Sequence, residues 1–145
     1  MPSPEVRNAI EDVLADYFWA LDTHDVERYA GTFWDDAVLE EVQLDGSVLT
    51  TTGSAALAEF ARTAWFDHVG YQHRDANRLY LADPDGRDDR WIVRAYWFTS
   101  RREQEEVEFL STGHSTDCFE RRGDEWRFAS RRIERWPASQ PHPLR

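Results

Sequence analysis

Two residues of the sequence, Asp22 and His73, supply a carboxylate and an imidazole that could act together in proton transfer. Asp22 follows Phe18 by one helical turn and ends an apolar stripe, so we expect its side chain to point toward the core. Because buried polar groups need partners, the two side chains could satisfy each other. The alternatives are a helix-ending aspartate in solvent and a histidine in a core or on an exposed sheet surface.

The segment that carries His73, residues 71–80, is typical of a β-strand, because aromatic and apolar residues are spread among polar ones without Gly or Pro. Strand side chains alternate between two faces, so His73 should share its face with Asp75, Asn77 and Leu79. If this face is interior, it brings an imidazole and a carboxamide into an apolar core.

A helix over residues 4–22 is expected to position Asp22. Ser3 can cap this helix and Pro4 suits its first position. Apolar residues at spacings of three and four form one stripe along it: Val6, Ile10, Val13, Leu14, Tyr17, Phe18 and Leu21.

The remaining pattern predicts further helices followed by long strands. A short helix should start at Asp25 and end at residues 34–36, and another should follow Gly53, with Leu57, Phe60, Ala61, Ala64 and Trp65 on its buried side. Between them, residues 37–42 and 47–51 resemble a hairpin around Asp45-Gly46. Long strands are expected at residues 71–80, 91–100, 107–120 and 126–136, with a turn at 83–86 and a charged connection at 101–106. This order predicts an α+β fold, a curved sheet whose concave face is covered by the N-terminal helices over a pocket.

Residues 1–136 are expected to form a single domain, and the proline-containing residues 137–145 a mobile C-terminal tail. The first residues lack the basic and apolar segments of a signal peptide, and no apolar run approaches the roughly 18 residues of a membrane span. We therefore expect a cytoplasmic protein without a membrane partner.

The composition excludes several classes of function. The net charge of −11 disfavours a nucleic-acid partner, because phosphate binding needs a basic face. All 17 basic residues are arginine, which excludes lysine-dependent Schiff-base chemistry. The histidines lack metal-ligand spacing, Cys118 is the single cysteine, and no glycine-rich phosphate loop is present, so we expect neither a metal nor a cofactor.

Several short motifs follow one another in a recognisable order: Leu21-Asp22, FWDDAV at residues 33–38, His73 with Asn77, FERR at 119–122 and WRF at 126–128. Together they resemble the SnoaL-like branch of the nuclear-transport-factor-2-like superfamily, which contains scytalone dehydratase and hexachlorocyclohexane dehydrochlorinase. The resemblance covers most of residues 5–136. It implies a cone-shaped, strongly bent mixed sheet wrapped around helices, a cystatin-like roll with a deep pocket.

The resemblance also implies roles for individual residues. Asp22 and His73 match a catalytic Asp–His dyad, in which the carboxylate holds Nδ1 and Nε2 takes a proton from carbon. Arg131 matches a pocket arginine, and the penultimate strand should turn Gly113, Ser115 and Asp117 toward the pocket and His114 away from it. The residues expected to bind the substrate are Tyr17, Phe18, Asn77, Ser115, Asp117 and Arg131.

Arg131 leaves two interpretations open. Strict alternation in the last strand turns Arg131 away from the side of Trp126 and Phe128, so all three can line one cavity only if a bulge intervenes. Without a bulge, Arg131 would be an exposed or interface residue.

The function implied is a dehydratase-type lyase that acts on a neutral or weakly anionic, hydrophobic, ring-containing, polyketide-like molecule. The alternatives are a ketosteroid-isomerase-like isomerase or polyketide cyclase, with an acid such as Asp117, and a noncatalytic binding module or small subunit of a ring-hydroxylating dioxygenase. A homo-oligomer is expected, with a trimer favoured over a dimer by the resemblance. The tryptophans also predict an oligomer, because one small core cannot hold four such large rings and some must cover sheet surface: Trp91, Trp97, Trp126 and Trp136.

Overall fold

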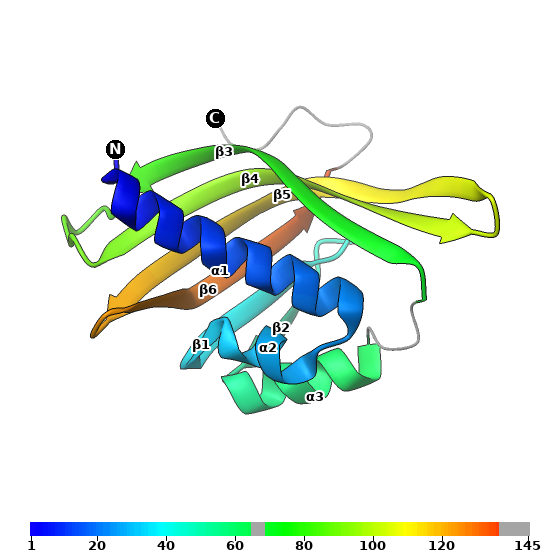
Figure 1. The fold of residues 1–145 in the computed structure, drawn as a ribbon, viewed down its shortest axis with the longest axis horizontal. Helices are drawn as coiled ribbons and strands as arrows, with labels where there is room; N and C mark the ends of the chain where they lie inside the picture. Colours follow the sequence, from blue (N-terminus) through cyan, green and yellow to red (C-terminus); the bar gives the residue numbers. More distant parts are fainter. Residues whose placement is uncertain (65–68, 137–145) are drawn as a thin grey trace.

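The computed structural model describes residues 1–64 and 69–136, in which three helices pack against one six-stranded curved sheet (Figure 1). The helices are α1 (Pro4–Thr23), α2 (Val26–Gly31) and α3 (Ser54–Ala64). The strands are β1 (Phe33–Val42), β2 (Val48–Thr52), β3 (Tyr71–Ala82), β4 (Arg90–Glu103), β5 (Glu106–Arg122) and β6 (Glu125–Arg135).

The sheet is mixed and has the strand order β2-β1-β6-β5-β4-β3. The β1–β6 pair is parallel and the other pairs are antiparallel. Figure 1 shows α1 lying across one face of the sheet, with α2 and α3 beside β1. The α+β class and the curved mixed sheet with N-terminal helices are therefore confirmed.

Helix α1 forms where its sequence predicts. The Ser3 side chain accepts a hydrogen bond from the Val6 N–H at 3.3 Å, and His24 ends the helix with a left-handed backbone, φ 60°. The apolar stripe packs onto an aromatic core, where the Phe33 and Phe128 rings stack 5.0 Å apart. The buried members of α1 are Ile10, Leu14, Tyr17, Ala20 and Leu21.

Two predictions about where elements end are wrong. Residues 34–36 do not end a helix, because α2 stops at Gly31 and β1 already starts at Phe33. The helical spacing of apolar residues continues past Gly31, where the helix ends. Phe33 instead pairs with Phe128 of β6, so this segment forms a strand. The charged stretch at residues 101–106 is the end of a long β4–β5 hairpin, with only Gln104 and Glu105 in its turn.

A bulge in β6 answers the question left open for Arg131. Phe119 of β5 pairs with Phe128, whereas the preceding Cys118 pairs with Ser130, so Ala129 is an extra residue. The inserted residue turns Phe128 and Arg131 to the same face, and both are buried there. Arg131 therefore faces the interior, together with Trp126.

A second bulge, in β3, overturns the predicted alternation of that strand. Ala76 pairs with Tyr96 and Leu79 with Arg94, so β3 holds one residue more than β4 across this step. Asn77 takes a left-handed backbone here, φ 54°. Asn77 is exposed and Leu79 is 54% exposed, so neither continues the inward face of His73 and Asp75.

Of the four large rings, some of which were expected to cover sheet surface, Trp136 lies on the outer face of the sheet against His114 and Tyr96. Trp126 is buried, while Trp91, Trp97 and Trp136 are half-buried. The exposed apolar side chains include Trp19, and Val107 and Phe109 on the β4–β5 hairpin. Trp65 and the predicted tail at residues 137–145 lie outside the described residues.

Candidate active site

Asp22 and His73 meet at the end of α1 and the start of β3. The Nδ1 atom of His73 lies 2.7 Å from Oδ1 of Asp22. The backbone N–H of His73 also donates to both carboxylate oxygens, at 3.1 Å each. Since β3 is an edge strand, this N–H faces away from β4, toward Asp22 at the end of α1. One carboxylate therefore fixes both the ring and the backbone of His73.

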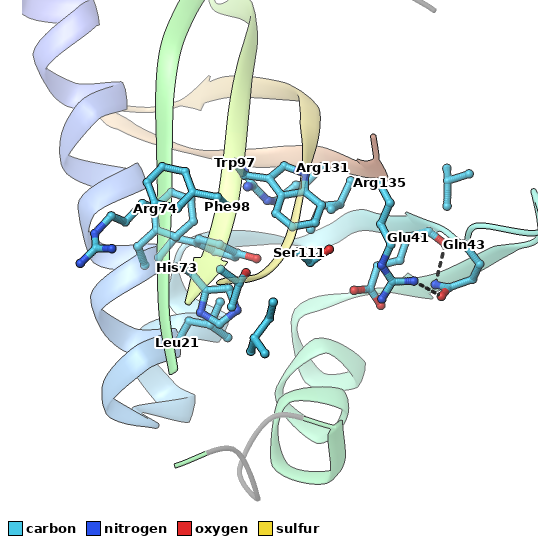
Figure 2. A pocket seen from close by; sticks show the side chains of 16 residues that line it. Leu21, Glu41, Gln43, His73, Arg74, Trp97, Phe98, Ser111, Arg131 and Arg135 are labelled. Carbon is cyan, nitrogen blue, oxygen red and sulfur yellow. Dashed lines mark hydrogen bonds between the residues drawn. The ribbon is translucent and has the colours of Figure 1, made fainter. Parts of the chain in front are cut away.

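His73 forms part of the wall of a pocket of about 160 Å³ between α1 and the sheet (Figure 2). Helix α1 contributes Tyr17, Phe18 and Leu21 to this pocket. The other lining residues come from five strands: Glu41 and Val42 of β1, Arg74 of β3, Trp97, Phe98 and Thr99 of β4, Leu110 and Ser111 of β5, Arg131, Ile133 and Arg135 of β6, with Gln43 after β1. The walls are thus mainly apolar and aromatic, with a few polar groups, as in most small-molecule sites.

Two backbone features shape the walls of this pocket. The pairing of β4 with β5 slips by one residue, so that Leu110 is inserted before Ser111 and both reach the pocket. Trp97 lies against Gly113, where an added Cβ would come 2.7 Å from its ring and 2.0 Å from the Glu134 carbonyl oxygen. Glycine is needed at position 113 because the Trp97 ring and the Glu134 carbonyl leave no room there for a Cβ.

Outside His73 lies a wider hollow of about 650 Å³, which is open to solvent. Asp22 lines this hollow together with Trp19, Tyr71 and Arg102. His73, Phe18 and Arg74 line both spaces, so the imidazole separates the pocket from the hollow. The side chains of His73 and Asp22 are 11% and 21% exposed, a partly shielded position for a proton-transfer pair.

Arg131 lies between the pocket and a buried acid. Its Nη1 donates to Oδ2 of Asp117 at 2.6 Å, and the Ser115 hydroxyl donates to the same oxygen at 3.0 Å. The guanidinium lies 4.6 Å from the Tyr17 ring centre and 5.3 Å from that of Phe128, both cation–π distances. Nε of Arg131 and Oδ1 of Asp117 are buried without a hydrogen bond to the described residues.

Burial shifts the titration of this cluster. Burial raises the pKa of Asp117 to about 6, outweighing the lowering effects of the Arg131 guanidinium and the Ser115 hydroxyl. The nearby Asp75 carboxylate adds to the increase. Burial likewise raises the pKa of Tyr17, so this phenol is a neutral hydrogen-bonding group at neutral pH.

The predicted substrate-binding residues fall into three groups. Tyr17, Phe18 and Arg131 line the pocket beside His73. Ser115 and Asp117 are fully buried on the inner face, but they support Arg131 and do not line the pocket. Asn77 is exposed at the β3 bulge and lines neither space.

His114 lies on the opposite face of β5 from Ser115. Its Nε2 atom is 3.0 Å from Oε2 of Glu134, and its ring meets the edge of Trp136. His114 is therefore buried outside the pocket, where the alternation of β5 predicts it.

Glu41 is a pocket residue that the sequence interpretation missed. It shares the inward face of β1 with Ala37 and Leu39, both buried, whereas Glu40 points outward to Arg132. Burial raises the pKa of the Glu41 carboxyl, and the Arg135 guanidinium opposes this effect. The signal was the alternation Ala37, Leu39, Glu41, which sets an acid at the end of an apolar strand face.

Within residues 1–64 and 69–136, no group of three or more His, Cys, Asp or Glu side chains is arranged to hold a metal ion. No helix in this part of the chain has the length and apolar character needed to cross a membrane.

One family model and several solved structures match this chain. The family model of the SnoaL-like domain matches residues 3–132. A cystatin-like protein of unknown function from Nostoc punctiforme shares 21% identity, with a TM-score of 0.78 over 99% of this chain and 98% of that one. Aln2 from a Streptomyces species shares 27% identity, with a TM-score of 0.76 over 93% of this chain and 94% of that one. LinA shares 21% identity, with a TM-score of 0.76 over 97% and 95%. No match is found among curated protein sequences.

Proposed function

Because the chain belongs to the family of SnoaL-like domains, we propose that it is a cofactor-independent lyase of the dehydratase type that acts on a hydrophobic, ring-containing small molecule. The observation that carries this proposal is the 2.7 Å contact between His73 Nδ1 and Asp22 Oδ1, made by a histidine that lines an apolar pocket. Proton abstraction from carbon needs a base of near-neutral pKa in such a place.

The proposed reaction starts with His73 as the base. The Asp22 carboxylate accepts the Nδ1 proton, so that Nε2 carries the basic lone pair in the neutral ring. Nε2 removes a proton from the carbon next to the substrate carbonyl. The Asp22 charge then stabilises the imidazolium, and loss of a group from the next carbon completes the elimination.

Arg131 is proposed to stabilise the negative charge that develops on the substrate oxygen. It is the cation buried against the pocket, and its position is fixed by Asp117 and by the Tyr17 ring. A preorganised donor in a site shielded from water stabilises an enolate without having to reorganise during the reaction. Tyr17 and Phe18 would pack against the apolar part of the substrate.

The pocket volume limits the proposed substrate. A cavity of roughly 150 Å³ accommodates benzene in a protein core, so about 160 Å³ suits one six-membered ring. Further parts of a larger substrate could extend into the hollow on the other side of His73. The chain carries a net charge of −11, which gives no attraction to polyanions.

We also propose that the chain forms a homo-oligomer, with a trimer favoured over a dimer. Val107 and Phe109, on a hairpin that extends beyond the rest of the sheet in Figure 1, are 54% and 74% exposed. Light scattering at micromolar concentration should report an oligomer, and a monomer would contradict the proposal.

The experiment measures proton abstraction directly, without requiring the natural substrate. Wild type and H73Q are incubated in D₂O with a six-membered cyclic ketone, cyclohexanone, and deuterium at the α-carbon is followed by NMR. We expect enzyme-dependent exchange in wild type and its loss in H73Q, with binding of the ketone retained by both. Binding without exchange in wild type would refute the lyase and favour a noncatalytic binding module.

A further inference from the structure

We propose that Glu41 is the general acid of the site, and that the substrate is a cyclic carbonyl compound with a hydroxyl group on the β-carbon. This inference rests on the proposed function, in which His73 removes the α-proton. It assigns the second proton of the reaction to a residue on the far wall of the same pocket.

His73 and Glu41 lie on strands that are far apart in the sheet. His73 stands on β3 at one edge, whereas Glu41 stands on β1, with β6, β5 and β4 between them. The curvature of the sheet turns both into one pocket, and Figure 2 shows them on two sides of it, with Ser111 between. A base and an acid on separate walls can act on two neighbouring atoms of a substrate ring held between them.

The surroundings of Glu41 suit a proton donor. No hydrogen bond to its carboxyl oxygens is found among the residues that the structure describes. Arg135 approaches from β6, but its Nη1 donates to Oε1 of Gln43 at 2.7 Å. The other charged or titratable groups facing the pocket are Tyr17 of α1, His73 and Arg74 of β3, and Arg131 of β6, and Tyr29 of α2 also interacts with Glu41 electrostatically. Burial raises the pKa of Glu41, so its protonated form persists to higher pH than that of a solvated glutamate.

The chemistry balances with these two groups alone. His73 Nε2 takes the α-proton as the C–H bond breaks, and the electron pair forms the new C=C bond. The C–O bond to the β-hydroxyl breaks, and that oxygen takes the Glu41 proton and leaves as water. The products are an unsaturated ketone, an imidazolium and a carboxylate. Exchange with solvent returns one proton to Glu41 and removes one from His73, and no oxidant or further reactant is needed.

The test compares three reactions of wild type, E41Q and a matched control, E40Q. The control makes the same change on the neighbouring residue, which points outward to Arg132. The probes are cyclohexanone for α-proton exchange, 3-hydroxycyclohexanone for loss of water, and 3-acetoxycyclohexanone for loss of acetate, which departs without a proton. Both eliminations give cyclohex-2-enone, which chromatography quantifies.

We expect E41Q to slow the loss of water about 100-fold, the lower end of the range for general acids. Exchange and loss of acetate should change less than about threefold, and E40Q should behave as wild type in all three reactions. The rate of water loss in wild type should fall as pH rises through the pKa of Glu41, and this alkaline decrease should be absent in E41Q.

Each other outcome is decisive. Normal loss of water by E41Q, or no loss of water by a wild type that exchanges the α-proton, would overturn the role of Glu41 and leave the role of His73 intact. An equal decrease of all three reactions in E41Q would show that Glu41 only maintains the shape of the pocket. Absence of exchange in wild type would refute the underlying function itself.

Discussion

Replacing Asp22 by asparagine should lower the activity of His73 as a base while the protein stays folded. The carboxylate contacts His73 twice: Oδ1 lies 2.7 Å from the ring Nδ1, and the backbone N–H donates to both oxygens at 3.1 Å. Asparagine has the same size but one acceptor oxygen, and its amide group presents a donor where a donor already stands. His73 would therefore lose its favoured tautomer or the backbone contact.

The size of the effect follows from the charge that is removed. Opposite charges about 4 Å apart interact by about 4 kcal/mol at the effective dielectric constant of a protein surface. Losing this stabilisation of the imidazolium in the transition state corresponds to roughly a thousandfold in rate. We expect a decrease of about 10² to 10⁴, a range that reaches the value of the equivalent change in the serine-protease triad. Loss of the charge-assisted hydrogen bonds should lower the free energy of unfolding by about 1.5–3 kcal/mol.

The assay for D22N is α-proton exchange into cyclohexanone, with urea unfolding of the same samples. The matched control is D12N, which removes one negative charge from an exposed position of the same helix. D12N should keep wild-type exchange. If D22N exchanges at the wild-type rate while folded and binding the ketone, then the Asp22–His73 pair is structural and the reasoning fails.

Three further changes test the supporting structure. R131M leaves the Asp117 carboxylate buried without its cation, so the free energy of unfolding should fall by about 3–5 kcal/mol at pH 7, and R131M/D117L should recover part of it in a double-mutant cycle. The folded-state pKa of Asp117 is raised from its ordinary 3.8 to about 6, so this group's contribution to stability falls as pH rises from about 4 to 6. The unfolding free energies of wild type and D117N should therefore diverge in favour of D117N by roughly 3 kcal/mol over that window, and a constant difference would contradict the raised pKa. N77G should keep full exchange activity with little change in stability, whereas N77V should be less stable by about 1–3 kcal/mol, because Asn77 holds a left-handed backbone at an exposed bulge. A large loss of α-proton exchange in N77G would show that Asn77 takes part in the reaction after all.

Residues on regular elements could be placed from the sequence. The spacing of the α1 stripe set Asp22 one turn after Phe18, and the pattern of β3 turned His73 inward, so the meeting of the two follows from periodicity. Ser115 and Asp117 reach the inner face for the same reason, while His114 turns outward to Glu134.

Residues next to backbone irregularities could not be placed in this way. No residue type near Ala129 predicts the bulge there, yet this bulge alone turns Arg131 inward beside Phe128. At Asn77 a mark exists, because asparagine tolerates the left-handed backbone, but the same residue type also suits a polar pocket position. The half-burial of Trp91 and Trp97 depends on which strands pair, which length and composition leave undetermined.

The most direct test of the central claim is the protonation state of the two His73 ring nitrogens, measured by ¹⁵N NMR on the folded protein at a pH where the ring is neutral. The Asp22–His73 contact predicts a proton on Nδ1 and a lone pair on Nε2, the nitrogen that must accept the substrate proton. D22N should shift the ring toward the opposite tautomer, whereas D12N should leave it unchanged. A wild-type ring that carries its proton on Nε2 would contradict the proposed role of His73 as the base.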